Sequence, residues 1–329
     1  MEDSRRDALE AWARLKVPQS VSPDAQLVPA SDDASFRRYF RFDRASVPAV
    51  FVDAPPELED SRPFVRISAA LVEAGLNAPV VHEFDEAAGF MMVTDLGTNL
   101  FLPALATDRR ERLLASAVDA LVTMQSVPLP LPPYDEAALQ REMDLFPDWF
   151  LDRQLGITRS SGVESMLDHV RAALVTSALS QPVVFVHRDY HSRNLMFGDE
   201  RPGILDFQDA VRGPVTYDLV SLLRDCYFRL PSDELDRWVE VFRDRVAGDV
   251  ETSTFRRWFD LMGMQRHLKC AGIFSRLHLR DGKARYLGDI PLVIDYLVEA
   301  GSAWGEFTDL VDWLVTDIQP RLDELQQPA

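Results

Sequence analysis

The chain contains little cysteine and has no long apolar run. Only Cys226 and Cys270 occur in 329 residues, which gives no disulfide framework, and two small buried apolar side chains would explain them. No uninterrupted apolar stretch approaches the length of a membrane-spanning helix. The charged segment MEDSRRDALEAW also has no apolar core of the kind found in signal peptides. We therefore expect a cytoplasmic protein with no membrane partner.

Basic residues are outnumbered by acidic ones. The chain has 35 Lys and Arg against 53 Asp and Glu, a formal net charge of −18. Binding to a nucleic-acid backbone requires a clustered basic surface, so this balance argues against a nucleic-acid partner. It says little about ATP, whose site is local and screened by magnesium. At 329 residues the chain is long enough for two domains or one two-lobed unit. The 47% apolar and 27% charged residues are typical of a globular protein.

Several signatures of enzymes and metal sites are absent from the sequence. The six histidines show no HExxH spacing and the two cysteines are distant, which leaves a zinc site without support. No G-x-S-x-G, Walker A or G-x-G-x-x-G string occurs. The sequence therefore disfavours a hydrolase, a P-loop enzyme and a dinucleotide-binding enzyme.

The most informative stretch is VVFVHRDYHSRNLMFGDERPGILDFQD, at residues 183–209. Its first four residues are apolar and β-branched or aromatic, and they predict a buried strand. Two further short strands are predicted at 195–197 and 203–205, with a turn between them. Each of the outer two strands is followed at once by polar residues.

These polar residues have the spacing of a phosphoryl-transfer site. His187, Asp189 and Asn194 form the pattern H-x-D-x-x-x-x-N, and Asp206 ends the last strand. Phosphoryl transfer mainly requires positioning of the attacking oxygen and neutralisation of charge by Mg²⁺, which prefers oxygen ligands. Asn194 and Asp206 can supply such ligands, leaving Asp189 to orient and deprotonate a hydroxyl. Ordinary strand-end aspartates are the alternative, which the complete pattern makes less attractive.

HRDYHSRN and ILDFQDA resemble the catalytic core of the aminoglycoside phosphotransferase family, kinases distantly related to protein kinases. GILDFQDAVRGPVTYDLVSLLRDC is more similar to one branch, the bacterial anomeric kinases for N-acetylmuramate and N-acetylglucosamine in peptidoglycan recycling. FRRYFR, DAPPELED, GFMMVTDLGT and GIFSRLHLRDGKARYLGDIP extend this similarity from about residue 30 to about residue 300. The resemblance implies an ATP- and Mg²⁺-dependent kinase that converts a small amino sugar to its α-1-phosphate.

The resemblance also implies an α/β (α+β), protein-kinase-like bilobal fold. A small nucleotide-binding lobe with a mostly antiparallel sheet is expected at 1–97, and a larger helical catalytic and substrate lobe at 98–329, with ATP between them. His187 is implied to orient the catalytic loop and Asp218 to support it. We expect a monomer.

Apolar periodicity supports this organisation, with strands in the first hundred residues and helices beyond. Pro214 is expected to begin a helix, and residues 281–291 are expected to form a loop. The predicted helices cover residues 4–16, 61–74, 107–126, 135–155, 160–179, 232–247 and 252–279.

The resemblance places the nucleotide contacts in two segments. The turn SDDAS, with Ser31 and Ser35, corresponds to the turn that covers the phosphates, although it has no glycine to ease close backbone approach. The segment Thr94-Asp95-Leu96-Gly97 corresponds to the hinge, so the backbone of Thr94 and Leu96 is expected to read the adenine edge.

The main departure from the family concerns lysine. Kinase-like folds usually place a phosphate-binding lysine on the third strand, paired with a helix glutamate, but the strand AVFVD has none. The only lysines are Lys16, Lys269 and Lys283. We hypothesise that Arg38 or Arg41 supplies the missing charge; a solvated strand edge is the alternative.

Acceptor contacts are expected from Asp225, Lys269 and Arg276. Lys269 and Arg276 lie on a basic predicted helix, where ordinary surface charge is the alternative. Two other functions stay open: the same chemistry on another alcohol (an aminoglycoside, choline or homoserine), and a catalytically weak nucleotide-binding scaffold. An acidic cleft would suit an aminoglycoside, and the missing lysine and glycine would suit a scaffold.

Overall fold

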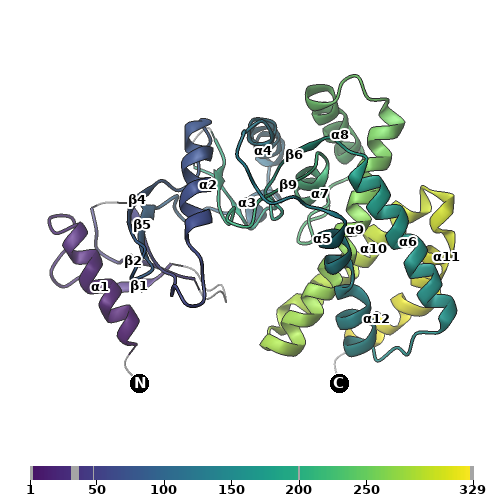
Figure 1. Cartoon of the computed structure of the whole chain (residues 1–329), viewed down its shortest axis with the longest axis horizontal. Coiled ribbons are helices and arrows are strands. Elements are labelled where there is room, and N and C mark those ends of the chain that lie inside the picture. Colours follow the sequence, from purple (N-terminus) through teal and green to yellow (C-terminus); the bar gives the residue numbers. More distant parts are fainter. Residues whose placement is uncertain (1–2, 31–36, 47, 199–200, 327–329) are drawn as a thin grey trace. The chain divides into compact units, whose positions relative to one another are not determined.

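The computed structural model describes residues 3–30, 37–46, 48–198 and 201–326. The chain forms two compact units (Figure 1), the first spanning residues 1–129 and 193–209 and the second residues 130–192 and 210–329. The boundary expected between residues 97 and 98 falls inside the first unit, and the two-lobe division stays a prediction. In the described part of the chain, no helix is both long and apolar enough to cross a membrane.

A five-stranded antiparallel sheet organises the first unit, in the order β1-β2-β3-β5-β4. The central strand β3 is buried at every residue, which explains why its sequence is apolar almost throughout instead of alternating. One aromatic side chain of β3, Phe51, belongs to the same buried cluster as Leu9 and Ala13 of the first helix. The elements are α1 (Ser4–Lys16), β1 (Leu27–Pro29), β2 (Arg38–Phe42), β3 (Ala49–Asp53), β4 (Val81–Asp85) and β5 (Phe90–Thr94).

A small hairpin also belongs to the first unit. It is formed by β7 (Leu195–Met196) and β8 (Gly203–Ile204), close to the two strands predicted there. A Cβ atom at Gly203 would lie 2.9 Å from the side chain of Leu96 and 3.0 Å from Cβ of Met196. A side chain at this position would therefore displace the Leu96 side chain, which packs closely over the hairpin. The remaining helices of this unit are α2 (Arg62–Glu73), α3 (Phe101–Ala104) and α4 (Arg110–Gln125).

The second unit is built around one long helix, α9 (Thr252–Asp281), of 30 residues. Gly272 permits its close packing, because a Cβ atom there would lie 2.3 Å from the backbone of Leu145. The elements packed against α9 are α5 (Glu136–Met143), the π-helix η1 (Phe146–Gln154), α6 (Ser161–Leu179), α7 (Tyr217–Leu223), α8 (Ser232–Val246), the 3₁₀ helix η2 (Ala284–Asp289) and α10 (Ile290–Ser302). The chain continues through η3 (Gly305–Phe307), α11 (Thr308–Trp313), η4 (Leu314–Ile318) and α12 (Gln319–Gln326).

The predicted helices are confirmed, with three local corrections. Pro214 does not begin a helix: it ends β9 (Val211–Pro214), which pairs antiparallel with β6 (Val183–Val186), and α7 begins only at Tyr217. Proline is tolerated there because the end of a ladder does not need its missing N–H donor. The helix expected at 135–155 is divided into α5 and η1, and the expected loop at 281–291 contains η2.

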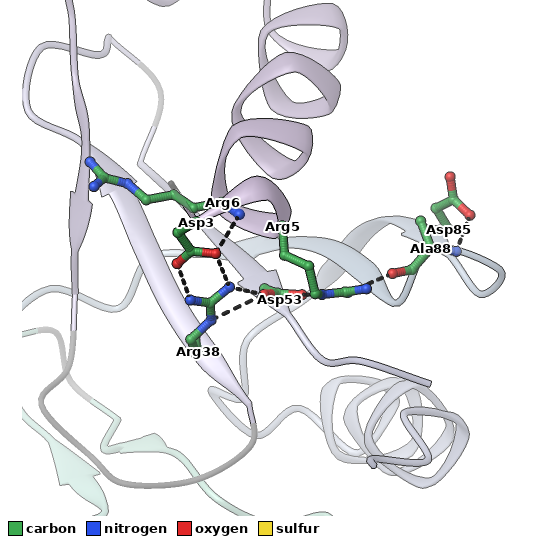
Figure 2. A network of polar contacts seen from close by, with 7 residues as sticks. All are labelled: Asp3, Arg5, Arg6, Arg38, Asp53, Asp85 and Ala88. Carbon is green, nitrogen blue, oxygen red and sulfur yellow. Dashed lines mark hydrogen bonds and ion pairs between the residues drawn. The ribbon is translucent and has the colours of Figure 1, made fainter. Parts of the chain in front are cut away.

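A buried carboxylate ties α1 to the sheet (Figure 2). Asp53, at the end of β3, is 0% exposed and accepts hydrogen bonds from Nε of Arg5 at 2.9 Å and Nε of Arg38 at 3.0 Å. Arg38 also pairs with Asp3, the N-cap of α1, and this hydrogen bond raises the pKa of Arg38. Arg5 additionally donates to the carbonyl oxygen of Ala88 at 2.8 Å. Two guanidinium groups thus compensate one desolvated carboxylate.

We expect Asp53→Asn to lower the free energy of unfolding by about 3 kcal/mol, because Arg5 and Arg38 lose their shared counter-charge. Urea denaturation measures the change. Asp60→Asn is the matched control, since Asp60 forms an exposed pair with Arg62 and should leave stability nearly unchanged. Equal losses in the two variants would contradict a special role for Asp53.

Candidate active site

The loop after β6, which carries Asp189, is held through its backbone by a carboxylate of α7. Asp218 is buried and accepts hydrogen bonds from the backbone N–H groups of His187 at 2.7 Å and Arg188 at 3.0 Å. Burial raises the pKa of Asp218 to about 7, while the two N–H donors act in the opposite direction. Asp218 thus fixes the two residues that precede Asp189, as expected for a supporting residue.

Arg188 is held at both its backbone and its side chain. Its φ of 77° is rare for a residue other than glycine. Its guanidinium pairs with Glu142 of α5 and lies over the ring of Tyr134, 5.9 Å from the centroid. Such backbone strain persists only where the surroundings enforce it, and it is common at functional loops. Asp206, with φ 63°, is the other non-glycine residue with positive φ in the described ranges.

Asp225 was expected to contact the substrate. In the structure it holds the Asp189 loop through backbone N–H groups, as Asp218 does. Its carboxylate accepts the backbone N–H of Ser192 at 2.9 Å and that of Tyr227 at 3.0 Å. It therefore fixes the far end of the Asp189 loop. A direct contact between Asp225 and substrate stays a prediction.

A cavity of about 120 Å³ opens beside Asp189 within the second unit. Part of its lining is aromatic: Phe274 lies 6.0 Å from Tyr227 and 5.5 Å from Tyr286, measured between ring centroids. The polar lining comprises Asp189, His191, Arg266 and Lys269, and the remainder is Cys226, Cys270, Ile273 and Leu277. The cavity thus combines apolar faces with charged groups, as small-molecule sites commonly do.

The electrostatics of this cavity are dominated by cations. The surrounding protein desolvates Asp189, which alone would raise its pKa, but the charges of Lys269, His191 and Arg266 outweigh this and lower the pKa to about 2. Burial also opposes the charge of Lys269, yet the neighbouring Tyr217 and Glu142 raise the pKa of Lys269 above its usual value. Asp189 is therefore ionised at neutral pH, and Lys269 and Arg266 keep their positive charges.

In the first unit, the β7–β8 hairpin brings Asn194 and Asp206 together. Nδ2 of Asn194 donates to Oδ2 of Asp206 at 3.4 Å, and Nε2 of Gln208 donates to Oδ1 of Asp206 at 2.8 Å. The backbone N–H of Leu205 donates to the carbonyl oxygen of Asn194 at 3.0 Å, which fixes the two segments side by side. An exposed carboxylate and a neighbouring side-chain amide, which also carries an oxygen acceptor, match the donor chemistry of Mg²⁺, which keeps several waters and binds substrate phosphates.

No group of three or more His, Cys, Asp or Glu side chains is placed to hold a metal ion within the residues that the structure describes. An ion bound by a complete cage of protein ligands, such as structural zinc, would need such a group. Magnesium in a kinase does not, since phosphate and water complete its coordination. The donor set of Asn194 and Asp206 thus fits the expected ion.

The expected nucleotide-binding residues that the structure describes lie in the first unit. Ser31 and Ser35 fall outside the described residues. Arg38 belongs to the network around Asp53, and Arg41 pairs with Asp95, the first residue of the expected hinge after Thr94, at 3.3 Å. Leu96 packs over the β7–β8 hairpin, so the hinge and the candidate magnesium ligands belong to one compact unit.

A third arginine, Arg37, was not among the expected contacts. Its side chain is 2% exposed, lies 3.4 Å from Glu59 and covers the ring of Phe64 at 5.3 Å from the centroid. Phe64 in turn stacks at 4.8 Å on Phe207, the residue after Asp206. The sequence FRRYFR alone did not distinguish Arg37 from Arg38 and Arg41. Its burial and its ion pair with Glu59 do distinguish it.

Among the expected acceptor contacts, Lys269 lines the cavity, whereas Arg276 lies further along α9 outside the described lining. Arg266 and Phe274 of the same helix were not among the three named acceptor contacts, although Arg266 belongs to the basic residues of this helix, of which one or two were expected to face the cleft. They lie three and five residues from Lys269, and the 3–4-residue spacing of a helix face from Arg266 through Lys269 and Ile273 would have identified this side of α9.

Comparison with known proteins gives a consistent result. Residues 26–255 match the model of the phosphotransferase enzyme family (APH). The N-acetylmuramate/N-acetylglucosamine kinase of Pseudomonas putida is 44% identical over 304 residues, covering 90% of this chain and 89% of the relative. The enzyme of the same name from Pseudomonas aeruginosa is 42% identical over 329 residues, covering 96% and 97%.

Solved structures with the same fold are much more distant in sequence. A GDP complex of aminoglycoside 2'-phosphotransferase-IIIa has a TM-score of 0.62 at 14% identity, covering 91% of this chain and 99% of the other. A choline/ethanolamine kinase family protein from Mesorhizobium loti has a TM-score of 0.59 at 14% identity, covering 95% and 97%. These matches confirm the expected kinase-like α/β fold.

We expect Asp218→Asn to lower the free energy of unfolding by about 2 kcal/mol, because an amide leaves one of the two backbone N–H groups without its acceptor. The phosphoryl-transfer rate should fall as well, since these N–H groups fix the Asp189 loop. Thermal unfolding and single-turnover kinetics measure the two effects. A variant with unchanged stability and rate would contradict the supporting role.

Proposed function

Because the chain belongs to the phosphotransferase enzyme family, we propose that it is an ATP-dependent kinase for the anomeric hydroxyl of N-acetylmuramate and N-acetylglucosamine. The product is the sugar α-1-phosphate, and the metabolic role is peptidoglycan recycling. The names of the curated relatives and their coverage of nearly the whole chain support this acceptor. The observation in this chain that supports it most directly is the charge of the cavity at Asp189.

The cavity charge discriminates between acceptor classes. Asp189 is the lone carboxylate in the described lining, against the permanent cations Arg266 and Lys269. An aminoglycoside or choline would bring further positive charge to these groups, at a cost of several kcal/mol for like charges that cannot be solvated. A neutral N-acetylated sugar, or one with a carboxylate, carries no such penalty. The apolar rings of Tyr227 and Phe274 suit the faces of a pyranose or an N-acetyl methyl group.

Asp189 orients the acceptor hydroxyl and receives its proton as the phosphoryl group is transferred. A carboxylate can do this only when it is ionised, and the low pKa of Asp189 meets that condition throughout the physiological range. Asp218 and His187 hold the loop that carries it. Asn194 and Asp206 bind Mg²⁺ in this proposal. The ion neutralises charge on the phosphates when it is bound.

We propose that residues of the first unit bind the nucleotide. Arg37 is a buried cation paired with Glu59, and it immediately precedes β2, the strand adjacent to the one where kinase-like folds carry their lysine. Arg41 near the hinge and Arg38 stay predicted contacts, as do the backbones of Thr94 and Leu96.

Two further assignments complete the proposal. Arg276, further along α9 than Lys269, is proposed to meet the lactyl carboxylate that distinguishes N-acetylmuramate from N-acetylglucosamine. We also propose that the protein is a monomer. It is proposed to act in the cytoplasm, because its substrates are ATP and a small sugar and because Cys226 and Cys270 are free thiols.

The acceptor is tested by measuring ATP consumption with Mg²⁺ against N-acetylmuramate, N-acetylglucosamine, glucose, kanamycin, choline and no acceptor. We expect turnover with the two N-acetyl sugars and phosphate at C1 by ³¹P NMR. Asp189→Asn should depress kcat by about 10³-fold with little change in KM, because its role belongs to the transition state. Turnover restricted to kanamycin or choline would contradict the acceptor. No turnover at all would favour a nucleotide-binding scaffold.

The three arginines of β2 and its approach can be separated by parallel substitutions. Arg37→Met should raise the KM for ATP by about tenfold or more, the effect of removing a charged contact to phosphate. Arg41→Met reports on the hinge, and Arg38→Met should mainly lower the thermal stability through loss of its pairs with Asp53 and Asp3. An unchanged KM for ATP in Arg37→Met would contradict the proposed contact between Arg37 and the nucleotide.

A further inference from the structure

We infer that Glu142, on α5, is a positioning residue for two parts of the site at once. Through Arg188 it fixes the loop that carries Asp189, and through Lys269 it fixes a cation of the acceptor cavity. The inference rests on the proposed function, in which Asp189 receives the proton of the acceptor hydroxyl and this cavity binds the acceptor. It extends that function to a residue that is not among the described lining of the cavity.

The carboxylate of Glu142 is surrounded by hydrogen-bond donors. Its Oε1 accepts a hydrogen bond from Nη2 of Arg188 and lies 3.2 Å from Nζ of Lys269. Its Oε2 accepts hydrogen bonds from Oη of Tyr134 and from Nε2 of Gln265, the latter at 3.4 Å. A carboxylate offers about four lone-pair sites. Donors from α9, from the Asp189 loop and from the segment before α5 therefore fix both the position and the orientation of this group.

The donors are themselves held by one another. Nε2 of Gln265 also donates to Oη of Tyr134 at 3.0 Å. Nζ of Lys269 donates to Oη of Tyr217 at 3.1 Å, and the ring of Tyr217 lies edge-on to that of Tyr134, with 5.4 Å between the centroids. These side chains are buried, which leaves little room for water to replace a lost contact. We therefore expect loss of the central carboxylate to displace the groups that it holds.

The first of these groups is Arg188, directly before Asp189. Its φ of 77° lies in the left-handed region, which is unfavourable for a residue with a Cβ atom. Asp218 of α7 accepts the backbone N–H of Arg188 at 3.0 Å, and Glu142 of α5 accepts a hydrogen bond from its guanidinium. Backbone and side chain are thus anchored to carboxylates on different helices. Removing Glu142 takes away the anchor of the side chain, so we expect the strained backbone to relax and to displace Asp189.

The second group is Lys269, which lines the cavity together with Asp189. Its Nζ is held between Oε1 of Glu142 and Oη of Tyr217. Burial would raise the pKa of Glu142, but Lys269 and Arg188 lower it below its usual value, so the carboxylate is charged. Glu142 is therefore a counter-charge for Lys269 and also directs its flexible side chain. We expect Lys269 to turn from its present position when that charge is removed, which alters the surface that binds the acceptor.

Two kinetic parameters report on the two groups separately. Displacement of Asp189 acts on the chemical step and lowers kcat, whereas displacement of Lys269 weakens acceptor binding and raises the KM for the acceptor. The KM for ATP should not change, because the proposed nucleotide contacts belong to the first unit. A residue that only supported folding would reduce the fraction of active enzyme, which lowers the apparent kcat and leaves both KM values as they are.

Glu142→Gln keeps the shape of the side chain and removes its charge. We expect kcat to fall by about tenfold or more, because small displacements of a reacting group have effects of at least this size. The KM for N-acetylglucosamine should rise by about tenfold, the order expected when a hydrogen bond to a charged group is disturbed. Glu136→Gln is the matched control on the same helix, since Glu136 is exposed and accepts a hydrogen bond from Gln140 at 2.9 Å. It should leave kcat and both KM values unchanged.

Substitutions of Arg188 test the effect on the loop. Glycine adopts a positive φ without the penalty of a Cβ atom, so Arg188→Gly should retain a higher kcat than Arg188→Met. Glu142→Gln added to Arg188→Gly should lower kcat little further, because a glycine needs no side-chain anchor. The same double variant should still show the raised KM for N-acetylglucosamine, since Lys269 has lost its counter-charge.

Substitution of Lys269 tests the effect on the cavity. Lys269→Met should mainly raise the KM for N-acetylglucosamine, and Glu142→Gln added to it should raise this KM no further. In such double-mutant cycles, two residues that act through one another show effects that do not multiply.

Thermal unfolding establishes that each variant is folded at the assay temperature. If Glu142→Gln is not, Glu142→Asp takes its place, since it keeps the charge but shortens the side chain, and it should change the same two parameters in the same directions. A lower kcat with both KM values unchanged would overturn the inference, as would effects of Glu142→Gln that simply multiply with those of Arg188→Gly and Lys269→Met. Failure of the proposed acceptor would instead appear as absence of turnover of the N-acetyl sugars by the wild type.

Discussion

The chemistry proposed for this site depends on one constraint: a carboxylate that the surrounding protein desolvates must stay ionised to receive a proton. Desolvation opposes that charge, and the fold meets the requirement with cations from α9 and with a loop fixed by Asp218 and Glu142. The interactions are coupled, because Glu142 holds both Arg188 and Lys269. The left-handed backbone at Arg188 is a further sign that the loop is held in a conformation that its sequence alone would not favour.

The sequence located most of the helices and strands and the loop that carries Asp189. Alternation and helical spacing located the sheet strands and α9, and the pattern H-x-D-x-x-x-x-N led to the loop that Asp218 supports and to the pairing of Asn194 with Asp206. The wrong helix start predicted at Pro214 shows why the ends of elements are harder to predict than the elements themselves. Proline suits the first turn of a helix and also the end of a strand ladder. In the structure Pro214 pairs with Val183 and ends a strand.

Residues whose importance arises from tertiary contacts could not be predicted. Arg37 is one of three arginines in the short string FRRYFR, and only its burial against Phe64 and its pairing with Glu59 distinguish it. Glu142 lies on an ordinary amphipathic helix, and its role appears only where Tyr134, Arg188 and Lys269 converge on it. The position of the two cysteines could not be predicted either: both line the cavity at Asp189 as buried free thiols.

The most direct measurement is a crystal structure of the protein with N-acetylmuramate bound. The account predicts that the sugar lies in the cavity lined by Asp189, Lys269 and Phe274, with its anomeric hydroxyl within hydrogen-bonding distance of the Asp189 carboxylate. It also predicts that Lys269 keeps its contacts with Glu142 and Tyr217. A sugar bound elsewhere, or one that presents a different hydroxyl to Asp189, would contradict the assignment of this cavity as the acceptor site.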